Sequence, residues 1–248
     1  MTRKFLLAVV GIACLLGTAV AQEPRGPDRS TSSHVPGVEV LALPNKPFSA
    51  NTTTEWTRTM EDGNVVRTHL TASLARDSSG RIYRERHSFV PDGSDDKAPL
   101  NEVHLYDPTT RSQALCSTHA FECVLTDYKP VTFYVAETPG TSRDGTRTMT
   151  RESLGSDTIE GIYVIGTRET TTIAAGAAGN EQPLVLIREF WYSDELETNL
   201  VVKRIDPREG TQVIRLSQIV VGEPNEHLFE LPIGYHVRDL RSRAQRTR

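Results

Sequence analysis

The sequence has no excess of positive charge. Its 248 residues include 28 lysines and arginines against 32 aspartates and glutamates, which gives a formal net charge of −4 at pH 7. Proteins that bind nucleic acids through electrostatic attraction present a basic face to the phosphates. We therefore expect no nucleic-acid partner.

The sequence also lacks the catalytic motifs that can be recognised from spacing. There is no G-x-S-x-G elbow, no H-E-x-x-H pair and no phosphate-binding loop. No two of its seven histidines stand at metal-ligand spacing, although His69, His87 and His104 could meet on neighbouring strands. The acidic run 91–99 lacks the ligand ladder of a calcium loop. We predict no metal, no cofactor and no enzymatic activity.

Apolar runs of signal-peptide length are absent except at the N-terminus. Two basic residues precede the apolar stretch 5–16, and Ala19 and Ala21 occupy the two small positions of the cleavage rule. The stretch is shorter than the roughly 20 residues that span a bilayer. We predict a signal peptide at 1–21 and a periplasmic or secreted chain that begins at Gln22, without a transmembrane segment.

A lipoprotein signal is the alternative interpretation of this N-terminus. It would use Cys14, but the residue three positions earlier is Gly11, where such signals carry a branched aliphatic residue. Cleavage after Ala21 instead removes two basic residues and no acidic ones, so the net charge changes from −4 to −6. The pattern favours export without a lipid anchor.

Cysteine is scarce, and only Cys116 and Cys123 lie outside the predicted signal peptide. An oxidising compartment favours their pairing. The segments beside them have the composition of strands, and the spacing suits a bridge across the base of a hairpin. A redox or metal pair usually has the tighter C-x-x-C spacing. We predict a structural disulfide.

Helical periodicity is rare, whereas strand-like alternation is sustained. Asp62-Gly63 is a strong hairpin turn between two β-rich segments. In the second segment, Leu70 and Leu74 share one face. In the next, Arg84, Glu85 and Arg86 are interpreted as an exposed charged strand face. Antiparallel hairpins of this kind predict an all-β fold.

The expected organisation is one antiparallel β domain at 38–237. A flexible leader rich in proline, glycine and serine precedes it at 22–37, and a basic disordered tail follows at 238–248. The only helical turn that the sequence favours in the middle of the domain is at 148–154.

The segment 183–192 (PLVLIREFWY) carries large apolar side chains on both of its faces. A strand of this kind must be covered on both sides. Core packing is one explanation for the second face. The alternative is a curved sheet whose apolar concave face is covered by loops or by a ligand.

Specific motifs occur along the chain: DSSGRIYRERH at 77–87, LYDPTTRSQ at 105–113, TIEG at 158–161, GNE at 179–181, DPR at 206–208 and FELPIGY at 229–235. In these motifs the chain resembles a group of secreted acidobacterial proteins. The strand pattern of its C-terminal end and the closing FELPIGY also resemble the LolA-like superfamily of periplasmic proteins. The first resemblance implies secretion, and the second implies a curved antiparallel half-barrel that holds lipid-like ligands.

Three classes of function follow from these observations. The first is a non-enzymatic binder of an apolar or amphiphilic ligand at the cell envelope. The second is an envelope structural or protein-interaction module, and the third is an unrecognised hydrolase. We favour the first. The residues expected to form its apolar concave surface are Trp56, Leu70, Leu74, Phe190 and Tyr192.

Overall fold

The computed structural model describes residues 38–94, 97–130 and 137–242. The predicted signal peptide, the leader, Cys14 and the end of the basic tail lie outside these residues. No helix in the described ranges is long and apolar enough to cross a membrane.

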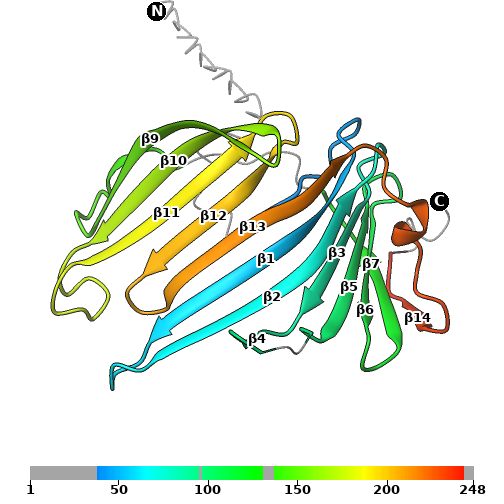
Figure 1. Cartoon of the computed structure of the whole chain (residues 1–248), viewed down its shortest axis with the longest axis horizontal. Helices are drawn as coiled ribbons and strands as arrows, with labels where there is room; N and C mark the ends of the chain where they lie inside the picture. The colour runs from blue at the N-terminus through cyan, green and yellow to red at the C-terminus, as the bar shows by residue number, and fades with distance from the viewer. Residues whose placement is uncertain (1–37, 95–96, 131–136, 243–248) are drawn as a thin grey trace, which may run out of the picture.

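The described residues form one sheet of fourteen strands (Figure 1). The strands are β1 Phe48–Thr59, β2 Val65–Arg76, β3 Ile82–His87, β4 Val90–Pro91, β5 Leu100–Asp107, β6 Ser112–Ser117, β7 Glu122–Asp127, β8 Gly140–Thr141, β9 Arg147–Ile159, β10 Ile162–Ile173, β11 Leu184–Ser193, β12 Thr198–Asp206, β13 Gly210–Val221 and β14 His236–Asp239. A 3₁₀ helix, η1, spans Glu226–Phe229. The order across the sheet is β14-β7-β6-β5-β3-β2-β1-β13-β12-β11-β10-β9-β8, and β4 pairs with β2.

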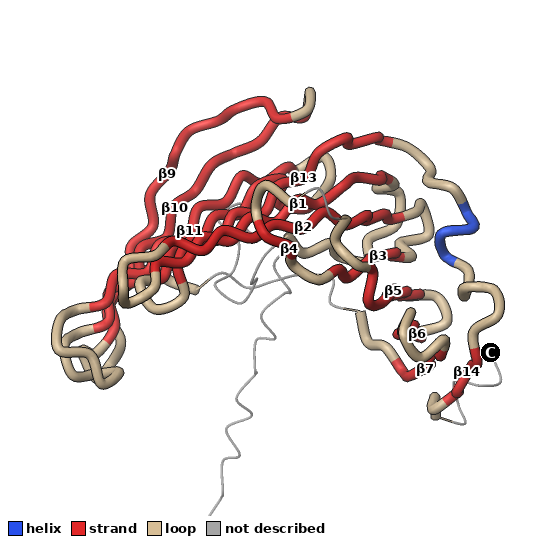
Figure 2. Tube along the Cα trace, turned by 60° about the horizontal axis from the view of Figure 1, so that its bottom comes forward, coloured by secondary structure: helices blue, strands red, loops and turns tan. Residues whose placement is uncertain are grey.

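The sheet is curved and does not close on itself (Figure 2). Its neighbours pair antiparallel except at one end, where β14 pairs parallel with β7. The strands form an arch, with β9 and β10 at one end and β7 and β14 at the other (Figure 2). The predicted all-β class and curved antiparallel half-barrel are confirmed.

The helical turn expected at 148–154 is wrong, because these residues belong to β9. Thr148 and Thr150 have the β-branched side chains that favour strands. The segment pairs with β10 through Met149↔Thr171 and Arg151↔Glu169. The glycine that follows them, Gly155, has a φ of 85°, and the register of the two strands shifts next to it. Pairing with β10 therefore overrides the helical turn that the sequence favoured at 148–154.

The last strand, β14, covers Arg238 and Asp239, which the sequence analysis assigned to the tail. The side chain of Asp239 accepts hydrogen bonds from Arg241, and Leu240 donates its backbone N–H to Leu125. The ordered chain therefore continues past residue 237.

An extended N-terminal segment, residues 38–43, fills the middle of the concave face. Val40 and Leu41 are almost fully buried. The segment belongs to a cluster with side chains from seven strands and the β11–β12 turn. Buried members of this cluster are Val38, Val40, Ala42, Phe48, Ala50, Leu74, Ile82, Ile162, Val164, Phe190, Leu196, Leu200, Val202 and Leu216. A single sheet thus obtains its inner layer from its own chain end.

Side chains, not strand pairing, fix the N-terminal segment in place. Arg76 is fully buried and donates to the carbonyls of Leu41, Lys46 and Leu196 at 3.0, 2.8 and 2.6 Å. Thr198 donates to the carbonyl of Glu39 at 2.7 Å. Burial lowers the pKa of Arg76 to about 10, and Glu197 and Tyr192 oppose this effect.

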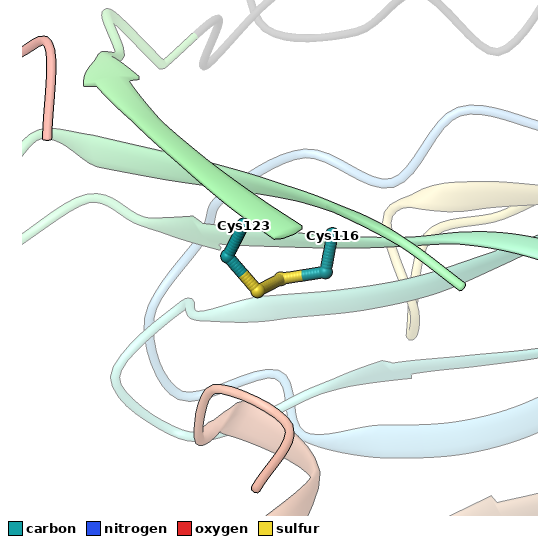
Figure 3. The surroundings of a disulfide bond; sticks show 2 residues. All are labelled: Cys116 and Cys123. Atoms are coloured by element: carbon teal, nitrogen blue, oxygen red, sulfur yellow. A yellow bond between two sulfur atoms is a disulfide. The ribbon is translucent and has the colours of Figure 1, made fainter. Parts of the chain in front are cut away.

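The convex face of β3–β7 is covered by the C-terminal segment, residues 226–235. Figure 2 shows η1 and its flanking loops outside the arch. Leu228, Phe229 and Leu231 pack there on a second cluster that contains Tyr83, Val103, Leu105 and both cysteines. Cys116 and Cys123 face each other in register and form the predicted disulfide (Figure 3). That prediction is confirmed.

Candidate functional site

The sheet splits beside the middle of β2. Strand β3 pairs with β2 only through Leu74–Arg76, and it then continues along β5 alone. Further along, β2 pairs with the short strand β4 at Thr68 and His69. A gap in the sheet therefore lies next to residues 70–73.

This split holds a cavity of about 350 Å³, which we call the concave cavity. Its volume is near the lower end of the range for small-molecule sites, roughly 300–1,000 Å³. Side chains from β1, β2, β3 and β13 line it together with the start of the N-terminal segment. The lining residues are Val38, Glu39, Thr52, Thr54, Leu70, Ala72, Leu74, Arg84, Glu85, Arg86, His87, Phe89 and Ile214.

The floor of the concave cavity is mostly apolar. Leu70 and Ala72 of β2 alternate with polar residues that point to the other face, as period-two strand geometry requires. Leu70 pairs in register with Thr54, which in turn pairs with Ile214. Phe89 adds an aromatic side chain at the gap, and its ring lies 5.7 Å from the ring of Trp56. Apolar atoms of a ligand would be removed from water here.

Two arginines of β3 line the same cavity. Arg84 and Arg86 are two residues apart and therefore share the concave face of the strand. Arg84 donates to the carbonyl of Val38 at 3.2 Å and lies 3.8 Å from the carboxylate of Glu39. Arg86 lies 3.9 Å from Glu102. The cavity thus combines an apolar floor with cationic side chains.

Glu85 replaces the missing strand partner at the split. One of its carboxylate oxygens accepts the backbone N–H of Ser73 at 2.8 Å, and His87 Nε2 lies 3.0 Å from that oxygen. Tyr83 donates its hydroxyl to the other oxygen at 2.6 Å. An unpaired buried N–H costs about 1–3 kcal/mol. The carboxylate therefore compensates locally for the departure of β3.

These hydrogen bonds shift two pKa values. Burial acts to raise the pKa of Glu85, but the hydrogen bonds from Tyr83, Ser73 and His87 outweigh it and hold this pKa below its ordinary value. Burial and then the Glu85 carboxylate raise the pKa of Tyr83. Glu85 is therefore ionised and fully engaged near neutral pH. The sequence interpretation of 84–86 as one exposed charged face is wrong for Glu85, which is partly buried and accepts hydrogen bonds from Ser73 and Tyr83.

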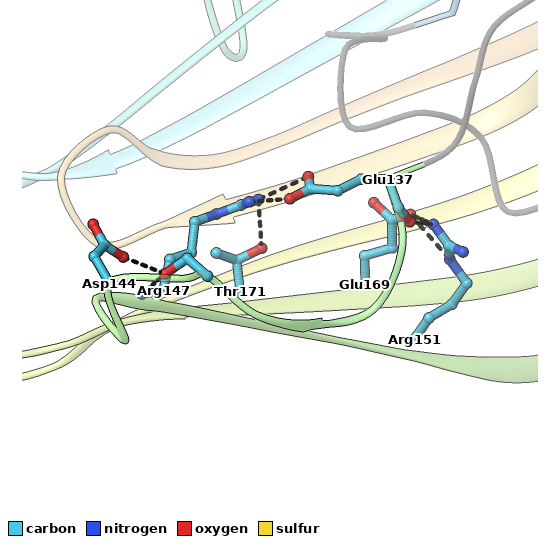
Figure 4. Close-up of polar contacts among 7 residues, drawn as sticks. Glu137, Asp144, Arg147, Arg151, Glu169 and Thr171 are labelled. Carbon is cyan, nitrogen blue, oxygen red and sulfur yellow. Dashed lines mark hydrogen bonds and ion pairs between the residues drawn. The ribbon is translucent and has the colours of Figure 1, made fainter. Parts of the chain in front are cut away.

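A second polar cluster lies on β9 and β10, away from the concave cavity (Figure 4). Arg151 contacts Glu169 at 2.7 Å, and Arg147 pairs with Glu137. Glu169 is 3% exposed, and burial raises its pKa while Arg151 opposes the change. The donors and acceptors of this cluster satisfy one another, so it acts as a structural ion-pair network.

The structure divides the five residues expected to form the apolar binding surface. Leu70 and Leu74 line the concave cavity. Trp56 does not line it, but its ring packs against the ring of Phe89, which does. Phe190 and Tyr192 are 0% and 3% exposed and belong to the packed interior. Their predicted role as ligand contacts stays a prediction.

Sequence reasoning did not find the cavity residues of β3 and β13. Arg84, Arg86, Phe89 and Ile214 come to Leu70 only through pairings between distant strands. The alternation of β3 indicates that Arg84 and Arg86 share a face, but it does not indicate that this face lies beside Leu70. The described residues contain no cluster of three or more histidine, cysteine or acidic side chains that could hold a metal ion.

No protein-family model matches the chain, and no curated protein matches it. Solved structures with a related sheet include an uncharacterized conserved protein from Thermus thermophilus, with 9% identity, a TM-score of 0.41 and coverage of 78% of this chain and 90% of that one. A chain of the MucA/MucB complex from Pseudomonas aeruginosa gives 11% identity, a TM-score of 0.40 and coverage of 79% and 59%. Lipoprotein LppX from Mycobacterium tuberculosis gives 12% identity, a TM-score of 0.26 and coverage of 72% of this chain and 88% of that one.

The chain spans less than two thirds of the length of the Pseudomonas chain. At identities of 9–12% and TM-scores of 0.26–0.41, these structures assign neither a family nor a role to this chain. The site must therefore be interpreted from its own residues.

Proposed function

We propose that the protein is an exported, non-enzymatic binder of an apolar or amphiphilic, lipid-like ligand, and that the concave cavity is its binding site. The observation that carries the proposal is the split between β2 and β3, which leaves a cavity with an apolar floor on the concave face of the sheet. Each methylene removed from water contributes about 0.8 kcal/mol before ordering costs.

A fluorescent-probe titration tests this function. The protein is titrated with N-phenyl-1-naphthylamine, and a single-chain amphiphile below its micelle concentration is then used to displace the probe. We expect saturable binding by the wild type. Leu70→Asp places a charge on the cavity floor and should weaken probe binding about tenfold or more, because burying an unpaired charge is costly.

The matched control is Leu240→Asp, since Leu240 is 56% exposed and lies outside the concave cavity. It should bind the probe as the wild type does. Circular dichroism verifies that both variants retain the sheet. No saturable binding by the folded wild type to any amphiphile would contradict the proposal.

Export is part of the proposal. The disulfide between Cys116 and Cys123 is consistent with an oxidising compartment. N-terminal sequencing of the mature protein should give Gln22 as the first residue. A sequence that starts at Met1, or a lipid on Cys14, would contradict it.

An envelope protein-interaction module is the second candidate, and the edge strand β9 favours it. Among the described residues, β9 is paired on its outer side only by β8, at Thr148 and Met149. Exposed strand edges can accept a strand from a partner. Proline at Thr158 would block such addition without entering the concave cavity. Loss of a partner in crosslinking from Thr158→Pro, with unchanged probe binding, would support this function.

A further inference from the structure

We propose that the ligand of the concave cavity is a single-chain amphiphile with an anionic head group, and that Arg86 binds the head group while Arg84 supplies a fixed positive charge beside it. The inference rests on the proposed function and names the class of ligand for that site. It is argued from the contacts of the two arginines and their acidic neighbours.

Arg84 is held in one place. It donates to the carbonyl of Val38 and lies 3.8 Å from Glu39, and its side chain is 30% exposed. A guanidinium carries five N–H donors, so these contacts leave donors for a ligand. Arg84 thus keeps a charge at the wall of the cavity whether or not a ligand is bound.

Arg86 is held loosely. Its side chain is 64% exposed, and its distance to Glu102 of 3.9 Å exceeds that of a hydrogen bond. Exposed ion pairs of this kind contribute about 0–1 kcal/mol. Arg86 can therefore turn toward a ligand at small cost, and its planar guanidinium can bind a carboxylate or phosphate with two hydrogen bonds.

Glu102 does not lose its only partner when Arg86 turns away. His104 Nε2 lies 2.8 Å from the same carboxylate oxygen of Glu102. Two carboxylates line the cavity itself, Glu39 and Glu85. Glu39 lies 3.8 Å from Arg84, and Glu85 is engaged by Ser73, Tyr83 and His87. The acidic residues are therefore paired within the protein, and Arg86 is the charge that remains available.

The shape of the cavity indicates one acyl chain. About 350 Å³ is at the small end for ligand sites. Leu70 and Ala72 of β2 and Ile214 of β13 supply the apolar side chains of the floor, with Thr54 of β1 between Leu70 and Ile214, and Arg84 and Arg86 lie on β3 across the split. An acyl chain on that floor places its head group at the arginines.

Displacement titrations with four twelve-carbon amphiphiles test the proposal: dodecanoate, dodecyl phosphate, dodecanol and dodecyltrimethylammonium. We expect the wild type to bind the two anions about tenfold more tightly than dodecanol, because charge-assisted hydrogen bonds to Arg86 form only with the anions. Raising the salt concentration should reduce this preference. Dodecyltrimethylammonium should bind most weakly.

The decisive variant is Arg86→Gln. It should lower the affinity for both anions about five- to tenfold and change the affinity for dodecanol less than twofold. Arg215→Gln is the matched control, since Arg215 is exposed on the opposite face of β13 and should leave all four affinities unchanged. A phosphate preference of tenfold or more over carboxylate would identify a phosphorylated head group, and equal affinities would identify recognition of charge alone.

Equal affinities of the wild type for dodecanol and the anions would overturn the anionic head group and leave the proposed function intact. The anionic head group would also be overturned if the wild type bound dodecyltrimethylammonium more tightly than the anions. The same holds if Arg86→Gln and Arg215→Gln bound the anions with equal affinity. If none of the four displaces the probe and no probe binds, the proposed function fails and this inference fails with it.

Discussion

At the scale of single residues, buried charges in this protein replace backbone hydrogen bonds that strand pairing does not supply. Glu85 accepts the N–H of Ser73 where β3 leaves β2, and Arg76 donates to three carbonyls of segments that lie outside the sheet. The sequence shows charged residues at both positions. Their roles depend on where distant segments lie, so local pattern could not reveal them.

Replacing Glu85 with glutamine should lower the free energy of unfolding at pH 7 by about 1–3 kcal/mol, because hydrogen bonds to a charged acceptor are lost. The pKa of Glu85 in the folded protein is below its ordinary value. Its stabilisation is therefore present above the unfolded pKa, about 4.3, and is lost as the pH falls through the lower folded pKa. Urea unfolding at several pH values between 3 and 7 tests this. As the pH falls, the free energy of unfolding should decrease less for Glu85→Gln than for the wild type.

The control is Glu55→Gln, which replaces an exposed glutamate on β1. Its unfolding free energy should stay within about 0.5 kcal/mol of the wild-type value. Parallel pH curves for Glu85→Gln and wild type would contradict the role assigned to this carboxylate.

Arg76→Met should be more damaging. It leaves the carbonyls of Leu41, Lys46 and Leu196 without their donor, and each such loss at a buried carbonyl costs about 1–3 kcal/mol. We expect a loss of about 3–5 kcal/mol in denaturant unfolding. The same change at exposed Arg67 should cost less than about 0.5 kcal/mol. A similar small loss at both positions would show that water replaces the Arg76 contacts.

At the scale of elements, hairpins were predictable and long-range pairings were not. The turn at Asp62-Gly63 and the hairpin of Cys116 and Cys123 depend on neighbouring residues, and both are present. The parallel pairing of β14 with β7 joins residues more than 110 positions apart, for example Val237 and Cys123. The departure of β3 from β2, which creates the concave cavity, is likewise set by β4 and β5 and not by β3 itself.

Removing the disulfide by Cys116→Ala with Cys123→Ala should lower the free energy of unfolding by about 2–3 kcal/mol on the loop-entropy model. The two cysteines pair in register between β6 and β7, so the hairpin should persist without the bond. Far-ultraviolet circular dichroism should be unchanged, while the urea midpoint falls. Full reaction of the native, unreduced protein with a thiol reagent would show that the bond does not form.

At the scale of the whole molecule, one curved sheet supplies the strands and the two chain ends supply the layers that cover it. The N-terminal segment covers the concave face, and the C-terminal segment covers the convex face of β3–β7. The sequence predicted cover on both faces for the segment 183–192, because both of its faces are apolar. It could not indicate that the chain ends provide it, because extended segments of mixed composition carry no periodic signal.

The two layers should stabilise the sheet independently. Val40 and Phe229 belong to separate clusters on opposite faces, with no shared residues. Val40→Ala should cost about 1.5–3 kcal/mol and Phe229→Ala about 1–3 kcal/mol, since Phe229 is only partly buried. Because distant sites without shared partners combine additively to within about 0.5 kcal/mol, the double variant should lose the sum of the two in urea unfolding. A loss that departs from the sum by more than about 1 kcal/mol would mean that the two faces are coupled through the sheet, and that a ligand in the concave cavity can alter the C-terminal segment on the far side.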